Sequence, residues 1–177
     1  MPIMQFKPED YKRIMDALDR VKKTAHKEIE DTMQRDCATQ FRFRLINNMV
    51  GNKFSSRFVP LTKRYAAWKA NVYKGYQQFW MLGGDLMKNL QVFKDRYDKQ
   101  DGWMAGIPAG VMDRGGKNWA MNDPPTLISE YARTNEFGGG KKPERPMFRY
   151  TQDEFIDDGS LDQFGKAALQ RIKLQWR

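Results

Sequence analysis

The chain has 177 residues, 40% of them hydrophobic and 30% charged, with a formal net charge of +9. This composition excludes a fully disordered chain, and no apolar run approaches the roughly 20 residues that cross a bilayer. The single cysteine, Cys37, and the single histidine, His26, exclude an intrachain disulfide and a Cys/His zinc cluster. Charged residues among the first ten leave no room for a secretory signal, so we expect a soluble protein made in the cytoplasm.

The positive charge is concentrated in one stretch of the chain. Residues 37–84 carry eight basic side chains and no acidic one, and ten aromatic residues are interleaved with them. Basic groups among aromatic ones can bind nucleic acid through phosphate attraction and base stacking. They can equally form a helical surface whose rim meets an acidic protein. Both interpretations remain open, and we favour the protein partner.

A long helix is predicted at the start of the chain, where Pro8 suits a first helical position. Its apolar residues recur at three- and four-residue steps along one face: Tyr11, Ile14, Leu18, Val21 and Ala25. The stripe then meets Glu28 and Thr32 but continues one position round at Ile29 and Met33. This face either packs on the chain's own domain, which the small number of heptads favours, or forms a seam with a neighbouring copy.

Four further helices are predicted downstream. One spans residues 37–50, one follows Pro60, a short one begins at Asp85, and the last begins at Ser160, which with Gln163 matches a capping box. Their apolar faces are, in chain order, Phe41, Leu45, Ile46 and Met49; Leu61, Tyr65, Trp68 and Val72; Leu86 and Leu90; and Leu161, Phe164, Ala168, Ile172 and Trp176. We expect the second of these faces to pack against the sheet predicted between residues 92 and 148.

The segment from 92 to 148 is rich in glycine and proline, and its apolar runs at 103–105 and 126–128 predict strands of a small sheet. Residues 98–125 form a long excursion, in which Trp103 and Trp119 lie among glycines and prolines that cannot bury them. We expect this excursion to become ordered against a neighbouring subunit.

The sequence thus predicts an α+β fold, with a long N-terminal helix and further helices packed on a small, mainly antiparallel sheet, and a C-terminal helix. We expect a single domain over residues 1–177. It comprises a helical part at 1–58, an α+β core at 59–150 and a C-terminal helix at 151–177.

No convincing catalytic or cofactor site emerges from the residues. His26 has no second histidine to complete a metal site, and Cys37 has the character of a small buried hydrophobe. The glycine-rich stretches 110–118 and 138–142 depart from the phosphate-binding loop because each lacks the Ser or Thr that binds magnesium. We expect a protein with no enzymatic activity, no cofactor and no metal.

Four motifs occur in order between residues 61 and 150. They are Leu-Thr-…-Trp-Lys at 61–69, a Gly-x-Leu turn within 82–90, Tyr-Ala-x-x-x-Glu-Phe-Gly at 131–138 and Arg-Pro-x-Phe at 145–148. Together they resemble the neck and tail-completion proteins of tailed bacteriophages, a family of minor tail or "virion morphogenesis" proteins. The resemblance covers about half of the chain.

This resemblance implies a structural virion protein that forms a ring, of six copies or of twelve, at the head–tail junction. Its partners would be a portal adaptor or stopper on one side and a tail terminator or tail-tube protein on the other. DNA would pass nearby without being specifically bound, and no membrane would be involved. The alternative function is a nucleic-acid-binding protein that uses residues 37–84.

The candidate interface residues are Lys63, Arg64, Lys69, Trp103, Trp119 and Arg145. The first three lie off the apolar face of their predicted helix, so we expect them to face outward. The two tryptophans mark the excursion. The N-terminal stripe and this excursion are the two surfaces with which one copy would contact its neighbours.

The two C-terminal motifs predict local contacts. Arg145 is held extended by Pro146, and it either reaches the carboxylate of Glu136 or remains a solvated loop residue. Phe137 is expected to close onto the sheet, and Gly138 to release the chain from its helix.

Overall fold

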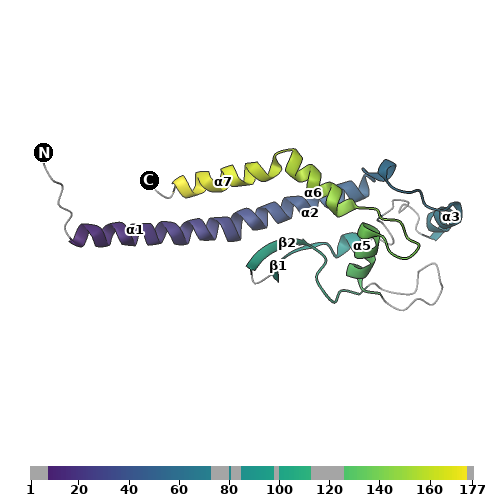
Figure 1. Ribbon diagram of the computed structural model, residues 1–177, viewed down its shortest axis with the longest axis horizontal. Helices are drawn as coiled ribbons and strands as arrows, with labels where there is room; N and C mark the ends of the chain where they lie inside the picture. The colour runs from purple at the N-terminus through teal and green to yellow at the C-terminus, as the bar shows by residue number, and fades with distance from the viewer. Residues whose placement is uncertain (1–7, 73–79, 81–84, 98–99, 113–125, 175–177) are drawn as a thin grey trace.

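The structure is a computed structural model, which describes residues 8–72, 80, 85–97, 100–112 and 126–174. One long helical rod dominates it, with a layer of helices along one side and a β-hairpin along the other (Figure 1). The predicted α+β fold, with a long N-terminal helix, a small antiparallel sheet and a C-terminal helix, is confirmed.

The rod consists of three consecutive elements, α1 (Pro8–Lys27), η1 (Glu28–Met33) and α2 (Gln34–Val50). The residues at both junctions have right-handed helical backbone angles, so the chain runs on without a break over roughly 65 Å. The helix expected at the start of the chain and the one expected at residues 37–50 are thus parts of a single rod.

η1 is a π-helical stretch, and it lies where the apolar stripe of α1 shifts by one position. A π-helical turn contains an additional residue, which rotates the side chains that follow by one position on the helix surface. The change from Glu28 and Thr32 to Ile29 and Met33 in the sequence falls within this stretch. The π-helix therefore accommodates the interruption of the stripe without ending the rod.

The helices α6 (Met147–Asp157) and α7 (Ser160–Leu174) lie along one side of the rod and run antiparallel to it (Figure 1). α6 packs against α2, and α7 packs against η1 and reaches the last turns of α1. Gly159 lies at the turn between the two helices with a φ of 74°, a backbone conformation that favours glycine. The C-terminal segment is thus two helices joined by a turn.

The strands β1 (Gln91–Tyr97) and β2 (Gln100–Gly106) form an antiparallel hairpin on the other side of the rod (Figure 1). The run at 103–105 lies in β2, as predicted. The run at 126–128 adds no strand to the hairpin, since Leu127 makes an isolated bridge with Met112 and Ile128 begins α5 (Ile128–Phe137).

α3 (Lys63–Val72) lies at the end of the molecule opposite the N-terminus (Figure 1). The hydroxyl of Thr62 accepts the backbone N–H of Tyr65 at 3.3 Å and so caps the helix. The prediction that α3 packs against the sheet is wrong, because α3 lies beyond the end of the rod whereas the hairpin lies beside α2 and η1. Trp68 is half-buried and stacks on Tyr65, with 5.4 Å between the ring centres.

The hydrophobic core lies where the C-terminal half of α2 meets α4 (Asp85–Lys88), α5 and α6. Its buried members are Leu45, Met49, Phe54, Phe58, Trp80, Leu86, Leu90, Ile128, Ala132 and Met147. Beside them the buried amide of Asn48 donates to the hydroxyl of Thr151 and to the carboxylate of Glu154, both at 3.1 Å. The core thus occupies one end of the rod, and α1 lies outside it.

Candidate functional site

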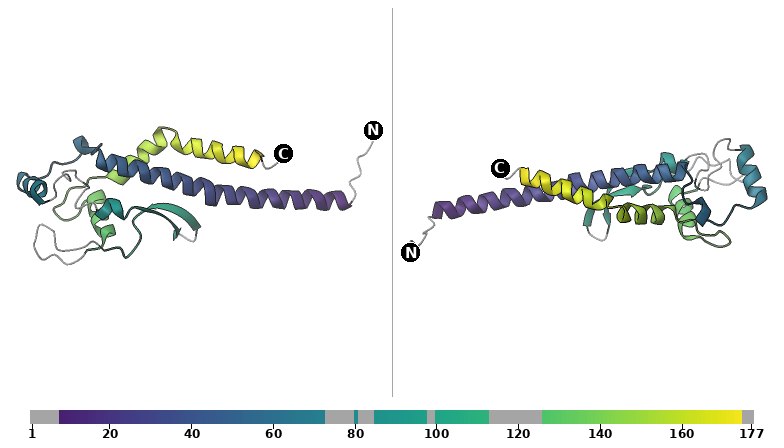
Figure 2. Two further views of the ribbon diagram at one scale, coloured as in Figure 1. Left: turned by 180° about the vertical axis from the view of Figure 1, so that it is seen from behind. Right: turned by 90° about the horizontal axis from the view of Figure 1, so that it is seen from above.

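The N-terminal half of α1 carries an apolar stripe that remains open to solvent. Its large side chains are 65% exposed at Tyr11, 46% at Ile14, 42% at Met15 and 50% at Leu18. Both further views show α1 extending past the end of α7 and past the hairpin (Figure 2). We call these four residues the exposed α1 stripe.

The sequence interpretation that this face packs on its own domain holds only for its second half. Val21 and Ala25 are half-buried where α7 reaches α1, whereas every residue from 11 to 20 is exposed. A helical segment of this length is only marginally stable in water without tertiary contacts. Four neighbouring apolar side chains on such a projecting helix are typical of a surface that packs against another chain. The exposed α1 stripe is therefore the candidate functional site.

The basic side chains of residues 37–84 are mostly used inside the protein. Three of them bind later elements: Arg42 the carbonyl oxygen of Leu90, Arg44 the carboxylate of Asp158, and Lys53 the carboxylate of Glu154. Lys63 and Arg64 are exposed, and Lys74 lies outside the described residues. Much of the charge that suggested an external partner therefore holds α2 and the turn after it to the rest of the fold.

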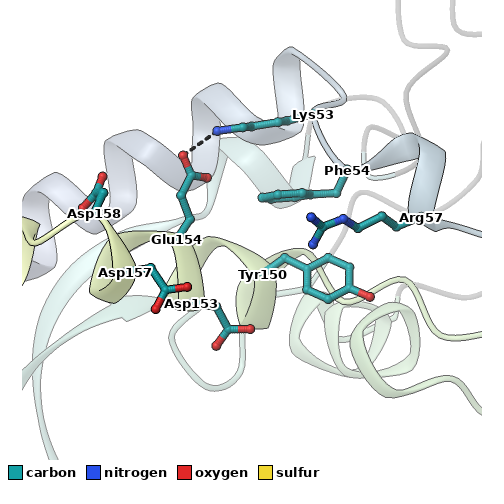
Figure 3. A pocket seen from close by; sticks show the side chains of 8 residues that line it. All are labelled: Lys53, Phe54, Arg57, Tyr150, Asp153, Glu154, Asp157 and Asp158. Atoms are coloured by element: carbon teal, nitrogen blue, oxygen red, sulfur yellow. Dashed lines mark hydrogen bonds and ion pairs between the residues drawn. The ribbon is translucent and has the colours of Figure 1, made fainter.

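Part of this pairing takes place in an open groove of about 450 Å³ between α6 and the turn that follows α2 (Figure 3). The guanidinium of Arg57 lies 5.6 Å from the ring centre of Phe54 and 5.1 Å from that of Tyr150. The α6 side of the groove carries the carboxylates of Asp153, Glu154, Asp157 and Asp158. The groove therefore lies between the basic turn after α2 and the acidic side of α6.

The pKa values of two carboxylates reflect this pairing. Partial burial raises the pKa of Glu154, but hydrogen bonds from Lys53 and Asn48 outweigh it and hold that pKa below its ordinary value. Hydrogen bonds from Ser160, followed by the interaction with Arg44, lower the pKa of Asp158. Asp158 accepts the backbone N–H of Ser160 at 2.9 Å, so it is Asp158, and not Ser160 as predicted, that caps α7.

Lys69 corrects the predicted basic interface, because its side chain is only 2% exposed. It follows Tyr65 by four residues, which places the two side chains on the same face of α3. Burial, and then the neighbouring guanidinium of Arg145, lower the pKa of Lys69 to about 8. Lys69 therefore belongs to the interior of the protomer, and only Lys63 and Arg64 of the predicted basic face are exposed.

Replacing Lys69 by methionine is expected to increase the free energy of unfolding at neutral pH by about 1–3 kcal/mol, because it removes a charged amine from a buried position. The folded-state pKa of about 8 lies below the ordinary value of 10.5. The unfolded state therefore binds more protons over this interval, and the wild type gains stability as the pH rises through it.

The stability difference between Lys69→Met and the wild type should accordingly shrink between about pH 7 and pH 10. Urea denaturation of both proteins at the two pH values measures it. A variant less stable than the wild type at pH 7, or a difference that does not change with pH, would contradict this assignment.

Neither alternative for Arg145 describes the structure, because the residue does not pair with Glu136 and is half-buried rather than a solvated loop residue. Its guanidinium donates to the carbonyl oxygen of Val59 at 3.3 Å, and its backbone N–H donates to that of Asn135 at 2.6 Å. Burial lowers the pKa of Arg145. The residue therefore holds the segment before α3 and the end of α5 together within the protomer.

The carboxylate of Glu136 instead caps α6. It is 5% exposed and accepts the backbone N–H groups of Phe148 at 2.9 Å and Arg149 at 2.8 Å. The Nε atom of Arg149 lies 3.5 Å from the same carboxylate. Pro146 stands at the N-cap position and offers no side-chain acceptor, so the acceptor comes from α5. The sequence analysis offered Glu136 as one possible partner of Arg145, whereas in the structure Glu136 pairs with Arg149.

Of the two predictions for the residues after Glu136, one is confirmed and the other is wrong. Gly138 ends α5 with a φ of 72°, and a Cβ atom there would lie 3.0 Å from the carbonyl oxygen of Lys142, so the predicted release of the chain is confirmed. Phe137 is 63% exposed and lies under the guanidinium of Arg149, 5.4 Å from the ring centre. Its predicted packing on the sheet is therefore wrong.

The two tryptophans of the predicted excursion have different outcomes. Trp103 lies in β2, is half-buried and is approached by the guanidinium of Arg35 at 6.0 Å from its ring centre. The first part of the excursion thus packs on the rod. Trp119 lies outside the described residues, so its place in an interface stays a prediction.

The remaining candidate groups are dispersed. His26 lies on α1 with its Nε2 atom 3.1 Å from the carboxylate of Glu30, and burial raises the pKa of the half-buried Cys37. Within the described ranges, no three His, Cys, Asp or Glu side chains gather in a way that could hold a metal ion. The same part of the chain contains no helix with the length and apolar character needed to traverse a membrane.

The chain matches no protein-family model, no curated protein and no solved structure. The geometry of the exposed α1 stripe and the four sequence motifs therefore remain the basis for assigning a function.

Proposed function

We propose that this protein is a non-enzymatic structural protein of a tailed-phage virion, which assembles with copies of itself into a ring at the head–tail junction. The observation that carries the proposal is the exposed α1 stripe, an apolar surface on a helix that projects from the core. Such a surface suits a protein whose folded protomer is completed by a neighbour.

A ring requires two different contact surfaces on each copy, because its subunits join head to tail. The exposed α1 stripe is one candidate. A second exposed apolar pair, Leu161 and Leu169, lies on α7, with 41% and 57% of their surfaces exposed. The two surfaces lie on different elements, as a head-to-tail contact requires. The four motifs supply the phage assignment, the portal-side and tail-side partners and the location in the virion.

The alternative, a nucleic-acid-binding protein, receives less support from the geometry. Phosphate contacts need basic side chains that face solvent. Arg42, Arg44 and Lys53 are bound to groups of the protein itself, and Lys69 is buried. The uninterrupted run of positive charge in the sequence therefore does not form an uninterrupted positive surface.

The experiment is to purify the chain, remove nucleic acid with nuclease and high salt, and measure particle mass by mass photometry and shape by negative-stain electron microscopy. We expect a closed oligomer of more than two copies that does not retard a DNA fragment at physiological salt. A monomer that retards DNA with a steep salt dependence would transfer the function to nucleic-acid binding. A monomer that does neither would reject both functions.

A further inference from the structure

We propose that the exposed half of α1 pairs with α1 of a second copy, and that the two helices run antiparallel. This goes beyond the proposed function and does not rest on it. The first support is that the exposed α1 stripe continues the surface on which α7 packs within the protomer.

The seam inside the protomer is antiparallel. α7 runs antiparallel to the rod along η1 and the last turns of α1 (Figure 2). Val21 and Ala25 belong to the last turns of α1 and are half-buried. α1 continues past the end of α7 (Figure 2), and its apolar face there is the exposed α1 stripe. The surface left open is thus the continuation of a two-helix contact, and an antiparallel helix would extend it.

The distribution of charge along α1 favours a second α1 as that helix. Residues 9–19 contain four acidic side chains (Glu9, Asp10, Asp16 and Asp19) and two basic ones (Lys12 and Arg13), which gives −2. Residues 20–27 contain four basic side chains (Arg20, Lys22, Lys23 and Lys27) and no acidic one, which gives +4 with His26 neutral. Antiparallel pairing with position 11 opposite position 21 sets residues 9–12, with a net charge of −1, against residues 20–23, with a net charge of +3. Parallel pairing sets like charges together.

The spacing of the stripe defines a register. Steps of three and four residues between Tyr11, Ile14, Leu18 and Val21 are those of helices that interlock their side chains. With the helices antiparallel, Tyr11 meets Val21 of the other copy and Ile14 meets Leu18. In this register Tyr11 of one copy and Tyr11 of the other are offset by ten residues along the helix axis, or roughly 15 Å.

An antiparallel pair has two-fold symmetry, whereas the subunits of a polar ring are related by rotation about a single axis. The inferred pair is therefore a form of the protein outside such a ring, and both forms would use the same stripe. The two proposals can be told apart by experiment. A ring whose α1 contacts are parallel or heterologous would still form, but it would not give the cross-link expected for an antiparallel pair.

Disulfide trapping tests the orientation. In a Cys37→Ser background, Tyr11→Cys and Val21→Cys are made on two chains that carry tags of different mass, mixed in equal amounts and oxidised mildly. A disulfide needs Cα atoms within about 7 Å, so the antiparallel register permits the mixed disulfide and excludes both homodimers. We expect the mixed species to exceed each homodimer at least five-fold.

The controls keep each outcome decisive. Gln170→Cys on α7 replaces an exposed residue away from the stripe, and it sets the level of random cross-linking. Ile14→Cys mixed with Leu18→Cys repeats the test should either variant of the first pair fail to fold. Dominant homodimers at positions 11 and 21 would mean a parallel contact. Cross-linking no higher than for Gln170→Cys would mean that α1 does not pair with itself. Either result overturns the proposal.

Discussion

Replacing Glu136 by alanine is expected to lower the free energy of unfolding by about 3 kcal/mol. The buried carboxylate accepts two backbone N–H groups at the start of α6 and lies 3.5 Å from the Arg149 side chain. Hydrogen bonds to a charged group contribute roughly 1.5–3 kcal/mol each, and the loss of a helix cap alone costs about 1 kcal/mol. Urea denaturation followed by tryptophan fluorescence measures the change.

Glu144 provides the matched control for this prediction. Its carboxylate also pairs with Arg149, at 2.9 Å, but it is 61% exposed and caps no helix. Glu144→Ala should therefore cost less than about 1 kcal/mol, as exposed ion pairs do. Equal losses for Glu136→Ala and Glu144→Ala would show that the cap of α6 does not depend on Glu136.

Leu18→Asp is expected to weaken self-association at least tenfold without changing the stability of the protomer. Leu18 is 50% exposed and lies in the part of α1 where every residue from 11 to 20 is exposed. Burying a leucine in an interface contributes about 2 kcal/mol, and a buried unpaired carboxylate costs more than that gain. A change of 1.4 kcal/mol corresponds to a factor of ten in the dissociation constant. Sedimentation velocity over a range of protein concentrations measures the shift.

Val59→Asp is the matched control, because Val59 is an apolar residue of similar exposure, 56%, located before α3 at the other end of the molecule. It should leave the assembly intact. Loss of assembly in both variants would mean that any added negative charge disperses this basic protein. Retained assembly in Leu18→Asp would remove the stripe from the contact.

The long helices could be predicted because their signals are local. The stripe of α1 recurs at helical spacing, and the shift after Ala25 marks the place where η1 adds a residue. α6 carries a comparable signal in Met147, Thr151 and Phe155, which recur every four residues and are all buried. The prediction placed one C-terminal helix at 151–177, with an Arg-Pro-x-Phe element before it, and so did not separate α6 from α7.

The partners of charged residues could not be predicted, because they depend on which distant elements meet. Arg44 and Asp158 are separated by 114 positions, and Lys53 and Glu154 by 101. Residues 37–84 contain no acidic residue, so their basic side chains were predicted to form an external surface. In the structure two of them lie beside acidic residues in or directly after α6. Lys69 could have been placed better, since its spacing of four from Tyr65 puts it on the face that the sequence itself assigned to the interior.

Amide hydrogen exchange of residues 8–20, measured by mass spectrometry at increasing protein concentration, tests most directly whether the exposed α1 stripe is the surface that assembly covers. In a free protomer this segment lacks tertiary cover, so its amides should exchange rapidly by local opening. We predict that protection of residues 8–20 rises at least tenfold as the protein assembles, while that of the buried α5 stays constant. Exchange in residues 8–20 that remains rapid in the fully assembled protein would contradict the account.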